Sequence, residues 1–135
     1  MDTNGDVYAV GSTYPGSLYE TNAGGRDYFV AKHSGSDGSL LWGHQGGTIS
    51  QENVYAVAVS SGGVLYTAGQ TTGSLYGTNA GAEDYTVVKY AGSLPAYVAP
   101  SGEPTAAAIG PPPSVWEVQD GTSSTDSGRA VAIDS

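Results

Sequence analysis

The sequence has no cysteine, and it has only four basic residues, one methionine and one phenylalanine among 135 residues. Without cysteine there is neither a disulfide framework nor thiol chemistry. Because 13 acidic residues oppose the four basic ones, the formal net charge is −9. A chain of this charge has no basic footprint for nucleic acid, and its attraction to an anionic membrane is disfavoured.

Long apolar runs and helical patterns are also missing. No run of about 18 apolar residues occurs, so the sequence predicts no membrane-spanning helix. The first six residues, Met1–Asp6, are acidic and polar, unlike a signal peptide. No window combines helical periodicity with helix start and stop signals. The chain has instead 21 glycines, ten tyrosines and many serines and threonines, a mixture typical of short strands joined by tight turns.

A tandem repeat organises the chain. The stretch from Gly16 to Gly35 returns from Gly73 to Gly92 with 13 of 20 positions identical. The first unit spans residues 1–58, and the second spans 59–135 with a proline-rich insertion at about 93–114. Units of a repeat protein bury their apolar faces against neighbouring units. The insertion is interpreted as a flexible or polyproline-like excursion from a sheet.

Eight short runs are predicted strands, four in each unit, because each is rich in Val, Tyr, Ala or Thr and bounded by turn residues. They cover residues 6–13, 27–34, 40–46, 53–60, 64–71, 84–91, 115–120 and 129–134. Several are apolar on both faces, as expected for a sheet between two other sheets. We therefore predict an all-β fold of antiparallel four-stranded β-propeller blades, two repeat units long. The longer segment 13–26 is expected to cross one face of a blade.

The two ends of the sequence are in phase with each other, because Asp2 aligns with Ser60 and Ser60 aligns with Asp134. The strand at 53–60 is expected to pair with the strand at 64–71, whereas the strand at 129–134 lacks such a neighbour. The 6–13 strand, of another copy or of the same chain, would be that neighbour. Two units are fewer than the blades of any propeller, so we expect a fragment of a longer array or a ring closed with other copies.

Four segments together resemble the SBBP-type β-propeller repeat: Asn4–Thr13, Gly24–Lys32, Gly38–Thr48 and Tyr55–Val59. The resemblance covers nearly the whole chain apart from the insertion. It implies a propeller of several blades, usually within a large extracellular or cell-surface protein. It does not imply one activity. The insertion after Lys89 and the presence of only two units depart from the pattern.

The N-terminal turn is the first candidate site. Asp2, Asn4 and Asp6 place oxygen ligands at alternate positions, as calcium loops do. No bidentate glutamate follows, however, and the corresponding segment Ser60–Val64 lacks both carboxylates. A hairpin turn is the simpler interpretation, since turns favour Asp, Asn and Gly.

Asp27 and Asp84 recur, each five residues before a lysine, Lys32 or Lys89. Strand alternation places residues an odd number apart on opposite faces, so neither pair is a simple ion pair. A catalytic acid with a lysine partner is one interpretation. A hydrogen bond from turn amides to the aspartate is the interpretation we favour, because packing needs the same residue in every unit.

Trp42 and Trp116 recur together with Gln45 and Gln119. A tryptophan can stack on a sugar or a quinone, but its recurrence favours packing between blades.

His33 and His44 are the only histidines, and their counterparts Tyr90 and Val118 show that they lie outside the repeat pattern. Two histidines are too few for a zinc site of three or four ligands. The sequence therefore predicts no catalytic, cofactor-binding or metal-binding residues.

Three functions remain open. The first is a non-catalytic propeller module that acts as a scaffold or as a binding surface for a protein or glycan, through variable loops on rigid blades. The second is an enzyme whose site forms on the axis of the assembled propeller, which should show non-repeated acids, bases or ligands. The third is a self-assembling pair of blades that closes a ring of six or eight blades as a homo-oligomer.

Overall fold

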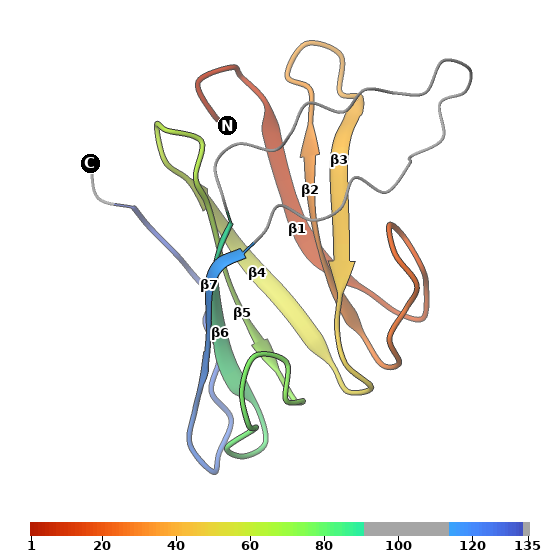
Figure 1. Ribbon diagram of the computed structural model, residues 1–135, viewed down its shortest axis with the longest axis vertical. Helices are drawn as coiled ribbons and strands as arrows, with labels where there is room; N and C mark the ends of the chain where they lie inside the picture. Colours follow the sequence, from red (N-terminus) through yellow and green to blue (C-terminus); the bar gives the residue numbers. More distant parts are fainter. Residues whose placement is uncertain (91–113, 134–135) are drawn as a thin grey trace.

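The computed structural model describes residues 1–90 and 114–133, which form an all-β fold of two antiparallel sheets (Figure 1). The first sheet has the order β1-β2-β3, with strands at Val7–Thr13, Asp27–His33 and Leu40–Gly46. The second has the order β4-β5-β6-β7, with strands at Glu52–Val59, Leu65–Thr71, Asp84–Tyr90 and Ser114–Asp120. No helix in the described ranges has the length and hydropathy to cross a bilayer.

Seven of the eight predicted strands are confirmed, each to within one residue at either end. The proline-rich insertion lies outside the described residues, apart from Ser114 at the start of β7. The predicted strand at 129–134 is wrong for residues 129–133, which are not in a strand, and residue 134 is not described. The physical reason is that a β-strand needs a paired neighbour, and no second strand lies beside this segment within the described chain.

The expected pairing between the strands at 53–60 and 64–71 is confirmed. β4 runs antiparallel to β5, with Ala56 opposite Ala68 and Val59 opposite Leu65. β4 belongs to the first repeat unit, yet it forms the edge of the second sheet. Sheets and repeat units are therefore out of phase by one strand, and β1 has β2 as its sole strand partner among the described residues.

The core lies between the two sheets. Strand alternation places Tyr28 and Val30 on the face of the first sheet that looks toward the second. Trp42 joins them from β3, and Leu65 and Val88 meet them from the second sheet. β4 crosses the first sheet against β1 and β2 (Figure 1).

The corresponding face of the second sheet points away from the first. Trp116 occupies on β7 the position that Trp42 occupies on β3, opposite Lys89 instead of Lys32. Trp42 is 7% exposed, whereas Trp116 is 42% exposed. The two sheets therefore stack in the same orientation, with the same face of each turned in the same direction.

The segment between β1 and β2 crosses the outer face of the first sheet, as expected. Its Tyr19 ring lies against Gly43 of β3 and meets the Phe29 ring edge-on. A side chain at Gly43 would overlap the Tyr19 ring, so only glycine leaves room for this crossing.

Candidate functional site

A buried aspartate and glutamine lock the β1–β2 segment onto the first sheet. Asp27 Oδ2 accepts hydrogen bonds from the Ala23 amide at 3.0 Å and from Gln45 Nε2 at 2.9 Å. Gln45 Oε1 in turn accepts from the amides of Leu18 and Tyr19. One side-chain pair thus satisfies three backbone donors of a loop that forms no ladder of its own.

The second unit repeats this arrangement. Asp84 Oδ2 accepts from the Ala80 amide at 3.0 Å and from Gln119 Nε2 at 2.9 Å. Gln119 Oε1 accepts from the amides of Tyr76 and Gly77. The predicted hydrogen bonds from turn amides to Asp27 and Asp84 are therefore confirmed.

Glu52, at the start of β4, forms a related buried junction with Thr48 and with Thr71 at the end of β5. Its Oε1 accepts from the hydroxyls of Thr48 and Thr71 at 2.7 and 2.9 Å, and its Oε2 accepts from the Thr48 amide at 2.7 Å. Glu52 is 1% exposed, so these contacts replace water. In the second unit Asp126 stands at the position of Glu52, but the sequence pattern did not predict this junction.

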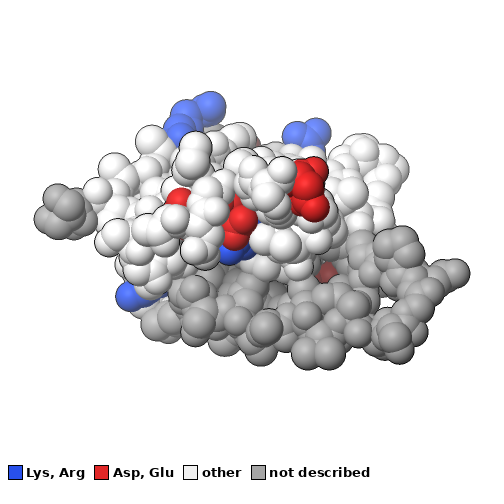
Figure 2. All heavy atoms as spheres, turned by 90° about the horizontal axis from the view of Figure 1, so that it is seen from above, with Lys and Arg blue, Asp and Glu red and all other residues white. Residues whose placement is uncertain are grey.

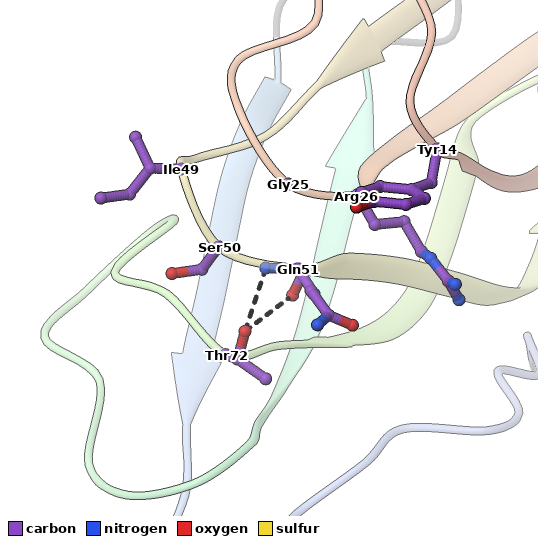
Figure 3. Close-up of a pocket in the computed structure, with 7 residues that line it drawn as sticks. All are labelled: Tyr14, Gly25, Arg26, Ile49, Ser50, Gln51 and Thr72. Atoms are coloured by element: carbon purple, nitrogen blue, oxygen red, sulfur yellow. Dashed lines mark hydrogen bonds between the residues drawn. The ribbon is translucent and has the colours of Figure 1, made fainter.

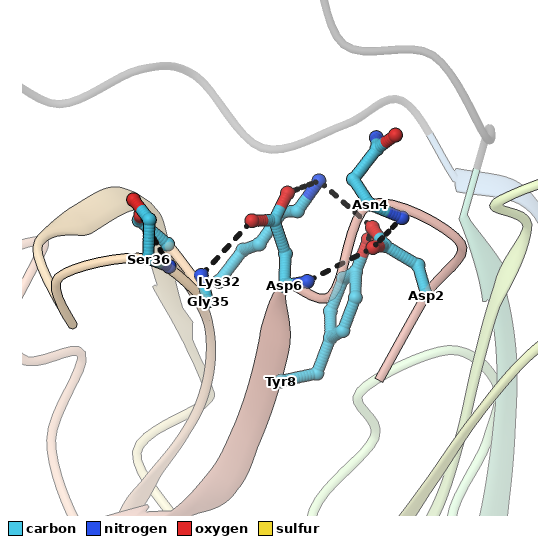
Figure 4. A network of polar contacts seen from close by, with 8 residues as sticks. Asp2, Asn4, Asp6, Tyr8, Lys32, Gly35 and Ser36 are labelled. Carbon is cyan, nitrogen blue, oxygen red and sulfur yellow. Dashed lines mark hydrogen bonds and ion pairs between the residues drawn. The ribbon is translucent and has the colours of Figure 1, made fainter.

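Lys32 pairs with the N-terminal turn and not with Asp27. Its ammonium group lies 3.0 Å from Asp2 Oδ2 and 2.9 Å from Asp6 Oδ2 (Figure 4). Asp2 Oδ1 accepts from the amides of Asn4 and Asp6, as in a hairpin turn. The positive charge beside these two carboxylates therefore comes from Lys32, in the place where a calcium loop would hold its ion. Seen from this end of the sheets, the charged side chains of the described residues form a few small groups among uncharged ones (Figure 2).

These contacts make the turn sensitive to acid. Burial raises the pKa of Asp2, but hydrogen bonds from Lys32 and from the Asp6 and Asn4 amides outweigh it and lower the pKa to about 2. The hydrogen bond from Lys32 lowers the pKa of Asp6 as well. Depressed carboxylate pKa values stabilise the folded state above the ordinary aspartate pKa, and that stabilisation is lost as the pH falls toward about 2.

We expect the Gly35 amide, which donates to Asp6 Oδ1 at 3.1 Å, to stay protected from solvent exchange down to about pH 4 and to lose protection below it. Amide NMR spectra recorded between pH 7 and pH 2 would measure this. An Asp2→Asn variant should weaken the turn at neutral pH and flatten the transition. Loss of protection already above pH 5 would contradict the assignment.

The recurring tryptophans differ in burial. The Trp42 ring packs edge-on against Tyr8, with 6.2 Å between ring centroids, inside the core between the sheets. Trp42 thus has a packing role, as predicted, in the core between the two sheets. Trp116 makes the matching contact with Tyr66, with 6.3 Å between centroids, but on the outward face of the second sheet.

The two histidines lie in different settings. His33 Nδ1 lies 3.1 Å from the Gly38 carbonyl in the β2–β3 turn. His44 Nδ1 donates to Glu20 Oε1 at 2.6 Å, and its Nε2 lies 3.1 Å from the Tyr28 hydroxyl. The Tyr76 hydroxyl donates to Tyr28 at 3.0 Å, which extends this chain of contacts across the sheets. Burial raises the pKa of Tyr28, so its hydroxyl stays protonated.

Sequence reasoning noted His44 as non-repeated but missed Glu20, whose counterpart is Gly77. Alignment of the two units shows that both Glu20 and His44 are non-repeated, and this shared asymmetry is the signal that could have pointed to them. The pairing itself depends on how the β1–β2 segment folds back, which the sequence pattern does not specify.

A hollow of about 540 Å³ lies at one end of the two sheets, between the β1–β2 segment, the β3–β4 loop and the end of β5 (Figure 3). It is lined by Tyr14, Gly25, Arg26, Ile49, Ser50, Gln51 and Thr72. The Thr72 hydroxyl bridges to the Gln51 backbone and fixes the floor of the hollow. The Tyr14 and Ile49 side chains remain largely exposed at its rim.

Most of the residues that line the hollow are not repeated in the second unit, although Ser50 has an identical counterpart in Ser124. The counterpart of Arg26 is Glu83, that of Ile49 is Ser123 and that of Gln51 is Thr125. Tyr14 lies where the second unit is one residue shorter. Sequence reasoning did not identify this site, although the exchange of Arg26 for Glu83 was visible in the alignment.

Among the described residues, no group of three or more His, Cys, Asp or Glu side chains is arranged to hold a metal ion. No protein-family model and no curated protein matches the sequence.

Proposed function

We propose that the chain is a non-catalytic β-propeller repeat module, with each sheet a blade, which acts as a scaffold that presents a binding surface. The resemblance to SBBP-type repeats supports this, as does the stacking of two sheets in the same orientation. The same resemblance favours an extracellular or cell-surface protein. The carboxylates that recur, Asp27 and Asp84, are buried and bound to turn amides, which is a structural use.

The observation that carries the binding role is the hollow, most of whose lining residues are not repeated in the second unit. Its volume lies within the range of small-ligand sites, about 300–1,000 Å³. An exposed tyrosine ring, a guanidinium group, an amide and a hydroxyl surround it, from Tyr14, Arg26, Gln51 and Thr72. A ring for stacking, with donors and one positive charge, suits a glycan that carries a carboxylate.

We expect Tyr14→Ala and Arg26→Ala each to weaken binding of an acidic oligosaccharide by tenfold or more, without changing the fold. The ligand would be selected on an array of neutral and acidic glycans, and its affinity measured by calorimetry. Arg129→Ala is the matched control, because Arg129 is exposed but lies outside the hollow.

Equal affinity of the Tyr14 and Arg26 variants and the parent chain would contradict the assignment of the hollow. If the hollow bound peptides and no glycan, the scaffold role would stand, but the proposed glycan ligand would be wrong.

An enzyme is the second candidate, and the Glu20–His44–Tyr28 chain favours it. Glu20 and His44 are a non-repeated acid and base, held by hydrogen bonds to each other and to Tyr28. Such pairs serve in proton transfer. A hydrolase screen in which His44→Gln abolishes a detected activity would support this alternative.

A further inference from the structure

In the described part of the chain, one edge of β1 has no strand partner, whereas both edges of its counterpart β5 are paired. β5 lies between β4 and β6, whereas β1 pairs with β2 alone among the described residues. Six of the seven residues of β5 are buried, whereas none of the seven in β1 is. Among the residues that the structure describes, the first sheet therefore has no strand in the place that β4 takes in the second sheet.

Residues 126–133 begin as β4 begins. The Asp126 amide donates to the Glu83 carbonyl at 2.6 Å, as the Glu52 amide donates to the Arg26 carbonyl at 2.7 Å. Asp126 Oδ2 accepts from the amide and hydroxyl of Thr122, as the Glu52 carboxylate accepts from those of Thr48. The first residues of this segment are thus held in the same way as the first residues of β4, the edge strand of the second sheet.

The same segment crosses the outward face of the second sheet, as β4 crosses the first. The Gly128 amide donates to the Gly69 carbonyl at 2.9 Å, and the Arg129 guanidinium lies over the Tyr55 ring. Residues 129, 130, 132 and 133 are exposed. Within the described residues, this strand-like segment therefore has no partner strand, and the open edge of β1 has no neighbouring strand.

The polar junction between Glu52 and Thr71 has counterparts in Asp126 and Thr13, which do not contact each other within the described part of one chain. Thr71 Oγ1, at the end of β5, donates to Glu52 Oε1 at 2.9 Å. Its counterpart Thr13 makes only a 3.4 Å contact with the Gly16 carbonyl among the described residues. Asp126, the counterpart of Glu52, is the carboxylate that would complete it.

We propose that residues 126–133 of one copy pair with β1 of a second copy and become the fourth strand of its first sheet. The register of β4 on β5 fixes the contacts. Asp126 lies opposite Thr13, Gly128 opposite Gly11, and Val131 opposite Ala9. Thr13 Oγ1 then donates to the Asp126 carboxylate. Strand addition of this kind satisfies backbone groups that an open edge leaves unpaired.

The same placement stacks the first sheet of the second copy on the outward face around Trp116. That contact repeats the packing of the two sheets within one chain, so copies join head to tail. The inference rests on the proposed blade stacking, but it does not depend on a ligand in the hollow.

Cysteine cross-linking provides a direct test, because the chain contains no cysteine of its own. Ala9→Cys and Val131→Cys would be placed in separate full-length chains, which are then mixed under mild oxidation. A disulfide requires Cα atoms within about 7 Å, as in a directly opposed cross-strand pair. We expect a mixed dimer to form at least tenfold faster than with Ala132→Cys, which points to the other face.

Equal cross-linking rates for the two positions, or none, would overturn the proposed register. A mass that stays monomeric by light scattering at all concentrations would overturn the association itself. Thr13→Val should shift the association to higher concentration while each chain keeps its circular dichroism spectrum. Glycan binding measured on dilute chains reports on the hollow separately, so failure of either proposal leaves the other identifiable.

Discussion

Replacing Gln45 with alanine should lower the free energy of unfolding by about 3–5 kcal/mol, because it leaves several buried polar groups without partners. Gln45 is 1% exposed. Its amide accepts from the Leu18 and Tyr19 amides at 2.6 and 3.2 Å, and it donates to the Gly16 carbonyl and to Asp27 at 3.0 and 2.9 Å. The truncation leaves the Asp27 carboxylate buried with fewer donors.

Chemical denaturation followed by circular dichroism would measure this loss. Gln119→Ala is the matched control, since Gln119 makes four contacts of the same kinds in the second unit but is only partly buried. Water can replace part of what the control loses, so we expect about 1–2 kcal/mol there. An equal loss of stability for the two variants would show that burial of the glutamine does not determine the cost of removing it.

The sequence was sufficient to predict the strands, because each run has the composition of a strand and clear turn boundaries. It also predicted that β4 pairs with β5 and that Asp27 and Asp84 accept from turn amides. Recurrence made these predictions reliable, since a contact required for packing appears in every unit. The strand at 129–134 was predicted by the same logic. It failed because pairing depends on a neighbour as well as on local preference.

The candidate sites were less predictable than the fold. The hollow around Arg26 forms where three separate segments meet, and the Glu20–His44 contact joins residues 24 positions apart. Lys32 reaches Asp2 and Asp6 because β1 and β2 are adjacent, with Tyr8 opposite Lys32. Such contacts depend on loop paths and strand register, which single-residue patterns do not specify. Comparison of the two units would have ranked Arg26, Glu20 and His44 by their asymmetry.

Gly47→Ala should destabilise the chain by about 3–4 kcal/mol, at or above the upper end for overpacking of a buried position. Gly47 does not need glycine for its backbone angles, because its φ is not positive. It needs glycine for space: a Cβ there would overlap Asp27 Oδ1 and lie 2.8 Å from Glu52 Oε2. Both carboxylates are buried, so the nearest atoms that would have to move belong to the hydrogen-bonded junctions themselves.

Any movement that relieves this overlap disturbs the bonds from the Ala23 amide and Gln45 to Asp27, or those from Thr48 to Glu52. Thermal and denaturant unfolding would measure the cost. Gly62→Ala is the control, since its added Cβ would meet nothing closer than the Ser60 hydroxyl at 3.8 Å, and it should change stability by less than about 0.5 kcal/mol. If Gly47→Ala were as mild as the control, the two carboxylates would have freedom to move. The buried junctions would then not be the rigid elements that hold the loops on the sheets.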